Sequence, residues 1–131
     1  MHGKDAEGAV NGALVIKAIY HPGYTSKEHK KYDFISGRIN TQHKLEFTYG
    51  TASARMKMAS GAGMWPAFWA LGNGKWPDCG EIDMMEHVGF KKDSAFFSIH
   101  TESFNHVIGT QKTKGIKIND LYNSFHVYAI E

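Results

Sequence analysis

The sequence predicts an all-β protein, either a sandwich or a barrel. Short apolar runs recur roughly every dozen residues, and turn-forming residues separate them. No segment keeps the 3.6-residue apolar period of an amphipathic helix. Aromatic residues make up 13% of the chain, which suits a β-sandwich core or a sugar-binding surface. These observations favour strands joined by turns throughout.

The first predicted strand is the β-branched run over residues 14–20. It begins after Asn11-Gly12 and ends at the turn residues His21-Pro22-Gly23. Residues 25–32 are polar and predict a loop. Three further strands are expected over 34–40, 44–49 and 53–58.

In the second half, Pro66 lies inside the apolar run 64–71, which therefore predicts an interrupted strand rather than a helix. A Gly- and Pro-containing loop follows it. The remaining expected elements are strands over 81–88, 94–101 and 125–130, and a single helical turn over 120–123.

The bulk properties fit one domain over residues 1–131, long enough to bury a hydrophobic core. A formal charge of +2 does not argue for a nucleic acid or a membrane as partner. Cys79 is the one cysteine, so a disulfide within the chain is excluded.

The segment Gly80-Glu81-Ile82-Asp83-Met84-Met85-Glu86-His87 places three carboxylates in an otherwise apolar strand. Burying an unpaired carboxylate costs several kcal/mol or forces it to take up a proton. A strand that lines a wet cleft resolves the conflict. Acids held together there have pKa values pushed apart, as acid/base chemistry requires.

Strand periodicity refines this prediction. Residues two apart share a face, so Glu81 and Asp83 point together while Ile82 points to the core. Glu86 joins them only if one residue bulges at Met84-Met85. Retaining glycosidases hold their carboxyl groups about 5–5.5 Å apart and inverting enzymes about 6.5–9.5 Å; a curved strand makes the shorter separation reachable.

Two other interpretations of these acids stay open at this point. One is an exposed edge strand that carries ordinary surface acids. The other is a metal site built from Asp83, Glu86 and His87. It is disfavoured because adjacent residues of a strand, such as Glu86 and His87, point to opposite faces.

The residues around the acids resemble the core of family 16 glycoside hydrolases, most closely the laminarinase-like (endo-β-1,3-glucanase) branch. The similar segments are Gly63-Met64-Trp65-Pro66-Ala67-Phe68-Trp69-Ala70-Leu71-Gly72, Trp76-Pro77-Asp78-Cys79-Gly80 with the acidic strand, Ser36-Gly37-Arg38-Ile39-Asn40-Thr41, Ala54-Arg55-Met56-Lys57, Ser98-Ile99-His100-Thr101 and Phe125-His126-Val127-Tyr128. They follow the family's order and cover nearly the whole chain.

The resemblance implies a β-jelly-roll sandwich of the concanavalin A-like type, with a sugar-binding cleft on its concave sheet. It assigns Glu81 as the nucleophile, Glu86 as the general acid/base and Asp83 as the group between them. It implies hydrolysis with retention through a glycosyl-enzyme intermediate. No organic cofactor is expected, and a structural calcium ion is left open.

The same resemblance indicates the residues that contact sugar. Tryptophan faces stack on pyranose rings, which favours Trp65 as a subsite wall; core packing is the alternative for Trp69 and the expectation for Phe68. The further candidates are Asn40, Arg55, His100 and Trp76. Arg55 has a structural ion pair as its alternative role, His100 a core position, and Trp76 a place as a loop anchor.

The chain departs from the family pattern in two respects. Ser53 stands where members usually carry a glutamate two residues before the arginine. Family members also have a strand before the region that matches residues 12–18 and continue beyond Glu131. We therefore expect a central fragment of the catalytic domain, incomplete at both ends, from a protein that works outside the cell or in the periplasm and whose signal peptide is not in this chain.

The leading hypothesis is a retaining endo-hydrolase of β-1,3-glucan, which acts on a polysaccharide partner and is a monomer when complete. An agarase- or carrageenase-like galactan hydrolase is the first alternative. A non-catalytic glucan-binding fragment of the same fold is the second.

Overall fold

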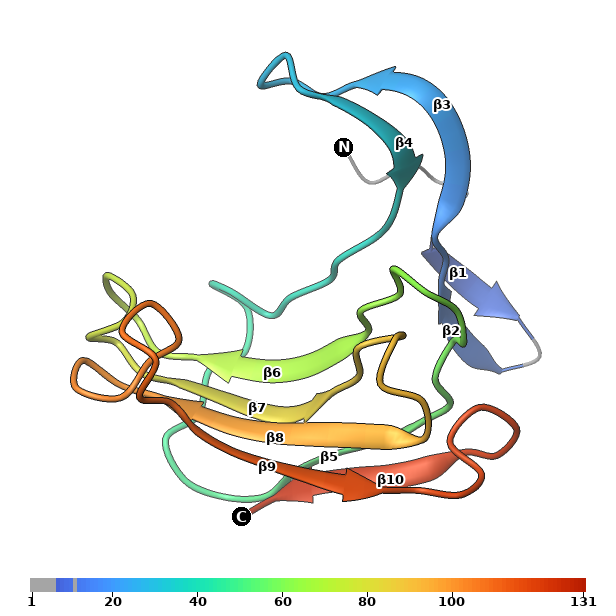
Figure 1. The fold of residues 1–131 in the computed structure, drawn as a ribbon. Coiled ribbons are helices and arrows are strands. Elements are labelled where there is room, and N and C mark those ends of the chain that lie inside the picture. The colour runs from blue at the N-terminus through green and yellow to red at the C-terminus, as the bar shows by residue number, and fades with distance from the viewer. Residues whose placement is uncertain (1–6, 11) are drawn as a thin grey trace. The chain divides into compact units, whose positions relative to one another are not determined.

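The computed structural model describes residues 7–10 and 12–131 (Figure 1). In this part of the chain the regular secondary structure consists of ten β-strands with turns between them, which confirms the all-β prediction. The strands are β1 (Glu7–Val10), β2 (Ala13–Ile16), β3 (Ile19–Thr25), β4 (Lys31–Ile35), β5 (Ala52–Met56), β6 (Ala67–Leu71), β7 (Glu81–Glu86), β8 (Ser94–His100), β9 (Lys112–Lys117) and β10 (His126–Ile130). None of the described residues forms a helix of the length and apolar character needed to cross a membrane.

Contacts divide the chain into two compact units, Met1–Thr48 and Tyr49–Glu131. In the first unit β1 pairs antiparallel with β2, and β3 pairs antiparallel with β4. The predicted strand over 14–20 is interrupted at Lys17-Ala18, so that it contributes to both β2 and β3.

The predicted turn at His21-Pro22-Gly23 is wrong, because β3 continues through it. The register with β4 shifts between Tyr20 and Tyr24. Pro22 has no N–H to donate and Gly23 has a φ of 73°, which a strand accommodates at such an irregularity. The loop predicted over 25–32 shortens to a turn, in which Ser26 N–H donates to Lys30 O over 2.8 Å.

Two strands predicted between residues 34 and 49 differ from the structure: one is mostly absent and the other does not form. Only Phe34 and Ile35 of the expected 34–40 strand lie in β4. The strand expected over 44–49 is wrong, because the N–H groups of Lys44 and Leu45 both donate to Thr41 O, at 2.9 and 3.0 Å, and form a local turn. An apolar run becomes a strand only where a partner strand supplies its hydrogen bonds.

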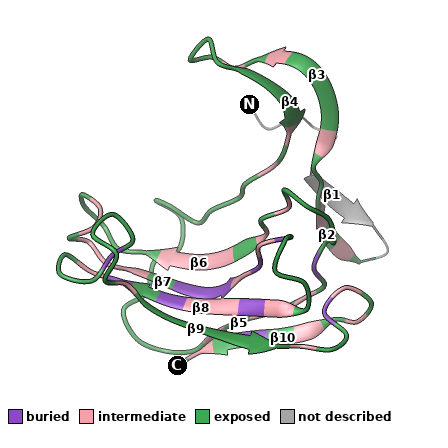
Figure 2. Cartoon of the chain, viewed as in Figure 1, coloured by how far each residue is buried: buried purple, intermediate pink, exposed green. Residues whose placement is uncertain are grey.

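The second unit contains two layers. One is the antiparallel sheet β6-β7-β8-β9, and the other is the pair β10-β5, which lies beneath it in Figure 1. The core between them includes Met58, Met85, Ala95, Leu121 and Tyr128. Buried positions gather on β7 and β8, whereas β9 is exposed along its length (Figure 2).

The sequence pattern does not predict β9. Its residues, Lys112–Lys117, contain three lysines and a glycine and lack apolar alternation. It is the edge of its sheet, and lysines on an edge strand oppose pairing with other chains. The strands expected over 53–58, 64–71, 81–88, 94–101 and 125–130 are confirmed with shorter bounds. The single turn near 120–123 is confirmed by the Ser124 N–H bond to Asp120 O, 3.2 Å long.

Candidate active site

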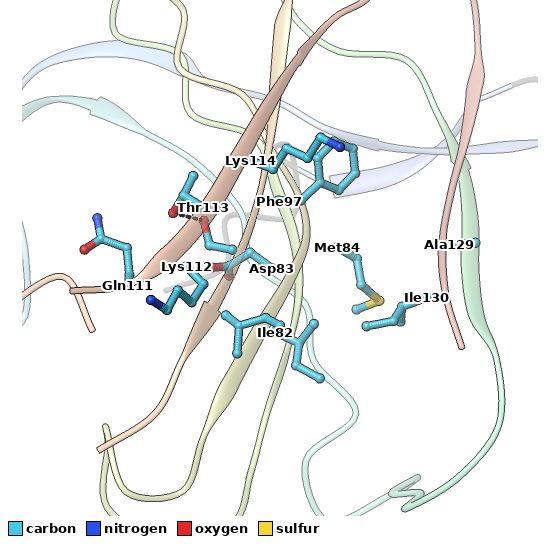
Figure 3. Close-up of a pocket in the computed structure, with 12 residues that line it drawn as sticks. Ile82, Asp83, Met84, Phe97, Gln111, Lys112, Thr113, Lys114, Ala129 and Ile130 are labelled. Carbon is cyan, nitrogen blue, oxygen red and sulfur yellow. Dashed lines mark hydrogen bonds between the residues drawn. The ribbon is translucent and has the colours of Figure 1, made fainter. Parts of the chain in front are cut away.

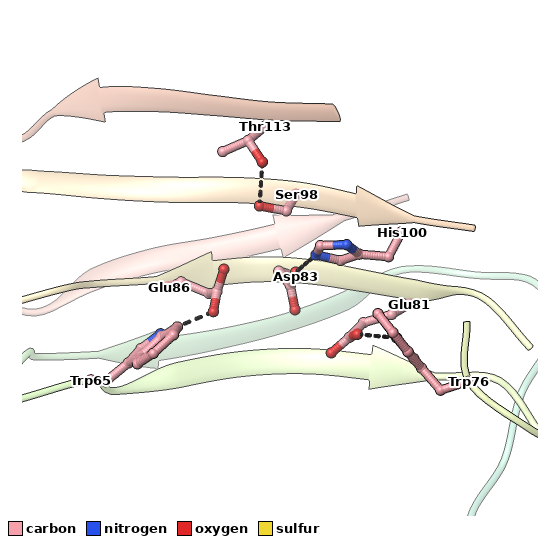
Figure 4. A network of polar contacts seen from close by, with 8 residues as sticks. All are labelled: Trp65, Trp76, Glu81, Asp83, Glu86, Ser98, His100 and Thr113. Carbon is pink, nitrogen blue, oxygen red and sulfur yellow. Dashed lines mark hydrogen bonds and ion pairs between the residues drawn. The ribbon is translucent and has the colours of Figure 1, made fainter. Parts of the chain in front are cut away.

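The strand β7 brings three acids to one face of the four-stranded sheet. Glu81 lies opposite His100, Asp83 opposite Ser98 and Glu86 opposite Phe96 on β8. Between Asp83 and Glu86 the register shifts, so that Met84 and Met85 together lie opposite one residue of β8. The predicted bulge is therefore confirmed, and it returns Glu86 to the face of the other two acids (Figure 4).

The opposite face of β7 is apolar. Met85 is buried in the core and pairs with Phe68 on β6, which confirms the core prediction for Phe68. Ile82 also points away from the acids, but its side chain is 37% exposed, so the expectation of a core position is corrected. It lines a cavity of about 570 Å³ together with Met84, Ile99 and Ile130 (Figure 3).

This cavity is not the place for a sugar. Six of its twelve lining residues are apolar, and neither Glu81 nor Glu86 contributes to it. Asp83, Gln111 and Thr113 also line it (Figure 3). Glu81 and Glu86 instead present their carboxylates to Trp76 and Trp65 on the other face of the sheet.

A tryptophan indole donates to each glutamate. Trp76 Nε1 lies 2.7 Å from Glu81 Oε2, and Trp65 Nε1 lies 3.0 Å from Glu86 Oε1. Figure 4 shows Trp65 at the Glu86 end of the row of acids and Trp76 at the Glu81 end. Such charge-assisted bonds fix the orientation of a carboxylate. Trp65 remains 67% exposed, so most of its indole surface is available to a ligand.

Asp83 lies buried between the glutamates and pairs with a histidine. His100 Nε2 is 3.2 Å from Asp83 Oδ2, and both side chains are buried. His100 Nδ1 is buried without a hydrogen-bond partner among the described residues, so Nε2 is the ring atom that contacts Asp83. The pKa of Asp83 is raised from 3.8 to about 7. Burial is the largest cause, followed by the charges of Glu86 and Glu81 and by a hydrogen bond with Glu81.

The polar network extends across the sheet. Ser98, opposite Asp83, is buried, and its Oγ lies 2.9 Å from Thr113 Oγ1 on β9 (Figure 4). On the other side Trp69 pairs with Asp83 from β6, and therefore shares the face of the acids rather than that of Phe68. A sugar-binding role for Trp69 stays a prediction that this placement allows.

Two of the predicted sugar-binding residues lie on other elements of the chain. Arg55 lies on β5, in the other layer, and its guanidinium carbon is 4.6 Å from the centre of the Phe125 ring. Arg55 is exposed, whereas the alternate residues Ala52, Ala54 and Met56 of that strand are partly buried. Asn40 belongs to the first unit, where its Oδ1 accepts the Gln42 N–H at 3.1 Å.

His87 has a structural role. Its ring is fully buried, with Nδ1 2.8 Å from Ser94 O and Nε2 3.1 Å from the Tyr122 hydroxyl. Because a carbonyl only accepts, Nδ1 carries the hydrogen and Nε2 accepts from Tyr122. Both nitrogens are engaged, which removes His87 from the metal site considered for Asp83 and Glu86.

Sequence reasoning missed His106 and Asn105. The His106 ring stacks on Trp76, with centroids 4.7 Å apart and planes 30° apart. Asn105 is buried and holds the surrounding loop by side-chain hydrogen bonds. The signal available was an asparagine in a short polar loop, where its side chain commonly bonds nearby backbone. Nothing local to His106 indicates a contact with Trp76.

Comparison with known proteins places this arrangement in a family. Residues 24–131 match the family described as Glycosyl hydrolases family 16. The beta-glucanase of Rhodothermus marinus is 42% identical over 126 residues, which are 92% of this chain and 42% of that protein.

Solved structures agree in fold. The endo-beta-1,3-glucanase of Pyrococcus furiosus superposes with a TM-score of 0.88 at 31% identity, over 98% of this chain and 51% of that chain. LamA from Z. galactanivorans, in complex with laminaritriose and laminaritetraose, superposes with a TM-score of 0.81 at 31% identity. The match covers 100% of this chain and 57% of that chain. The chain thus spans about half the length of these relatives and has the fold of the corresponding part of their β jelly roll. The chain belongs to glycosyl hydrolases family 16.

Proposed function

We propose that the protein with this sequence hydrolyses β-1,3-glucan chains internally, with retention of anomeric configuration. The observation that carries the proposal is one face of β7 on which two glutamates, each bound by an indole N–H, flank a buried aspartate. Relatives described as laminarinase and endo-beta-1,3-glucanase support this choice of substrate.

In the first step, the Glu81 carboxylate attacks the anomeric carbon while Glu86 donates its proton to the departing glycosidic oxygen. The C–O bond to the leaving sugar breaks, and a glycosyl ester forms on Glu81. In the second step, Glu86 takes a proton from a water molecule that attacks the same carbon, and the ester bond breaks. Two displacements on one carbon restore the starting configuration.

Asp83 assists by holding a proton beside Glu81. With a pKa of about 7, Asp83 carries this proton in much of the population at neutral pH and hydrogen-bonds Glu81. Ester formation removes the negative charge of Glu81, and one of the charges that opposes Asp83 ionisation disappears with it. Ester formation on Glu81 therefore lowers the pKa of Asp83 while the intermediate lasts.

Sugar rings would lie against the exposed face of Trp65, next to the acid/base Glu86. Trp69, on the same face of the sheet as Asp83, is the second aromatic surface. The galactan-hydrolase and glucan-binding alternatives use the same face, and substrate assays separate them.

The test is a reducing-sugar assay on laminarin, mixed-linkage glucan and agarose, with proton NMR of the first product formed. We expect release from laminarin, an initial β-anomer, and a loss of roughly 10⁴-fold or more in kcat for Glu81→Ser. Glu28→Ser, an exposed glutamate of the first unit, is the matched control and should match the parent. Binding of laminarin without release would select the glucan-binding alternative, and release from agarose alone the galactan hydrolase.

A further inference from the structure

Residues 101–110 form the loop between β8 and β9, here termed the Asn105 loop. Hydrogen bonds within the loop hold its conformation. The Asn105 amide nitrogen donates to Thr101 O at 3.2 Å and to Glu102 O at 2.9 Å. Its Oδ1 accepts the N–H groups of Val107 at 3.1 Å and Ile108 at 3.3 Å. All four hydrogen-bonding positions of this buried amide are used, so the next residue, His106, has a defined place.

Thr110 closes the same loop. Its Oγ1 accepts the Asn105 N–H at 3.2 Å and donates to Ser103 O at 3.0 Å, while its own N–H donates to Asn105 O at 3.0 Å. A loop that satisfies its own backbone groups in this way holds its shape without large buried area. It can therefore serve as a rigid support for a neighbouring side chain.

The side chain that this loop presents is His106, and it meets Trp76. The two rings stack at 4.7 Å, and the His100 ring lies 5.3 Å from His106 and 6.1 Å from Trp76. Trp76 in turn donates its indole N–H to Glu81 over 2.7 Å. A continuous chain of contacts thus runs from the Asn105 loop through two rings to one carboxylate oxygen.

We propose that His106 is a positioning residue for the nucleophile. The indole N–H lies in the plane of its ring, so a ring stacked on the indole face fixes the direction in which that hydrogen points. The direction of the N–H in turn fixes the rotation of the Glu81 carboxylate relative to the anomeric carbon. The inference rests on the proposed function of Glu81, and it assigns to the Asn105 loop the role of holding the attacking group in line.

The first test measures the Trp76 indole directly, by ¹H–¹⁵N NMR of the 131-residue chain. The cross-peak is identified by its loss in Trp76→Phe. In His106→Ala we expect the cross-peak to move toward the chemical shift of a free indole. Hydrogen exchange of the indole N–H should become about 3- to 10-fold faster, the factor that corresponds to the free energy of one aromatic pair. His106→Phe keeps a flat ring and should retain the parent values. Unchanged shift and exchange in His106→Ala would overturn the proposal.

The second test separates positioning from general stability by kinetics on an aryl β-laminarioside. His106→Ala should lower kcat and kcat/KM alike, by about 3- to 10-fold, with KM unchanged. His106→Phe should restore most of the loss. Val107→Ala, an exposed neighbour in the same loop, should have parental kinetics.

Removal of the nucleophile gives the decisive comparison. In Glu81→Ser, added azide replaces the missing carboxylate and attacks the anomeric carbon of the aryl laminarioside. The bond to the aryl oxygen breaks, the phenolate departs, and the product is the glycosyl azide. Adding His106→Ala to that variant should not change the azide-dependent rate, because the group that His106 positions is gone. If His106→Ala lowered the azide-dependent rate by the same factor as it lowers kcat of the parent, that result would contradict a role through Glu81. If the parent chain releases nothing from laminarin, the proposed function fails, whereas the NMR measurement still decides whether His106 orients Trp76.

Discussion

At the scale of single residues, the three acids of β7 differ mainly in what covers them. Asp83 is buried and pairs with His100, whereas each glutamate is half-buried and takes a hydrogen bond from a tryptophan. Burial disfavours charge on Asp83, and the indole N–H groups orient the two glutamate carboxyl groups. Three like residues in one short strand thus acquire separate properties from their surroundings.

The raised pKa of Asp83 predicts a specific dependence of stability on pH. Its folded value, about 7, lies above the ordinary value of 3.8, so the native state binds this proton more tightly than the unfolded chain does. The free energy of unfolding therefore falls as pH rises through this interval. Asp83→Asn is neutral at every pH, keeps a donor for Glu81 and an acceptor for His100, and should remove this contribution.

Urea unfolding at pH 4 and pH 8 tests this prediction. We expect Asp83→Asn to match the parent near pH 4 and to exceed its free energy of unfolding by roughly 1–4 kcal/mol at pH 8. Asp78→Asn, an exposed residue of the preceding loop, is the control and should follow the parent at both pH values. A parental pH dependence in Asp83→Asn would contradict the assignment.

At the scale of elements, the hairpin from β6 to β7 carries Trp76 on a closely packed loop. Gly72 N–H donates to Gly80 O at 3.0 Å and closes the hairpin. A Cβ atom at Gly72 would lie 1.9 Å from the Cys79 carbonyl oxygen, which is far inside contact distance. The absence of a side chain at Gly72 is therefore what lets this loop fold back toward Glu81.

Gly72→Ala should accordingly open the hairpin. We expect the free energy of unfolding to fall by about 1–3 kcal/mol, and the Trp76 indole cross-peak to shift because its loop moves. Lys75→Ala, at an exposed position of the same loop, should change stability by less than about 0.5 kcal/mol. Urea unfolding measures both, and equal stabilities of the two variants would refute the steric argument.

At the scale of the whole molecule, the second unit contains a small core under the acid-bearing sheet. Leu121 is 0% exposed and packs with Met58, Met85, Ala95 and Tyr128. The turn that carries Leu121 also carries Tyr122, which binds His87 directly after β7. The core therefore supports the strand on which the acids lie.

Shortening a side chain of this core should lower the stability of the protein. We expect Leu121→Ala to lower the free energy of unfolding by about 2–4 kcal/mol, since it removes a fully buried side chain and leaves a cavity. Leu45→Ala, where the leucine is 65% exposed, should lower it by less than about 1 kcal/mol. Thermal or urea unfolding of both variants provides the comparison, and a parental stability for Leu121→Ala would be inconsistent with this core.

The sequence by itself determined the acid-bearing strand and its phase. Alternation is a local property, so the spacing of Glu81, Asp83 and Glu86 predicted the bulge at Met84-Met85 that the register contains. The apolar runs of β6, β7, β8 and β10 were predictable for the same reason. Each depends on residues a few positions apart.

Only the tertiary structure decided what depends on distant partners. Among the described residues no strand pairs with the run over 44–49, which forms a local turn on Thr41 instead. The lysine-rich β9 became a strand because β8 offered an edge. The contact of His106 with Trp76 likewise needed the folded loop. Pairing and stacking between distant segments depend on where the whole chain places them, and no local pattern in the sequence records that placement.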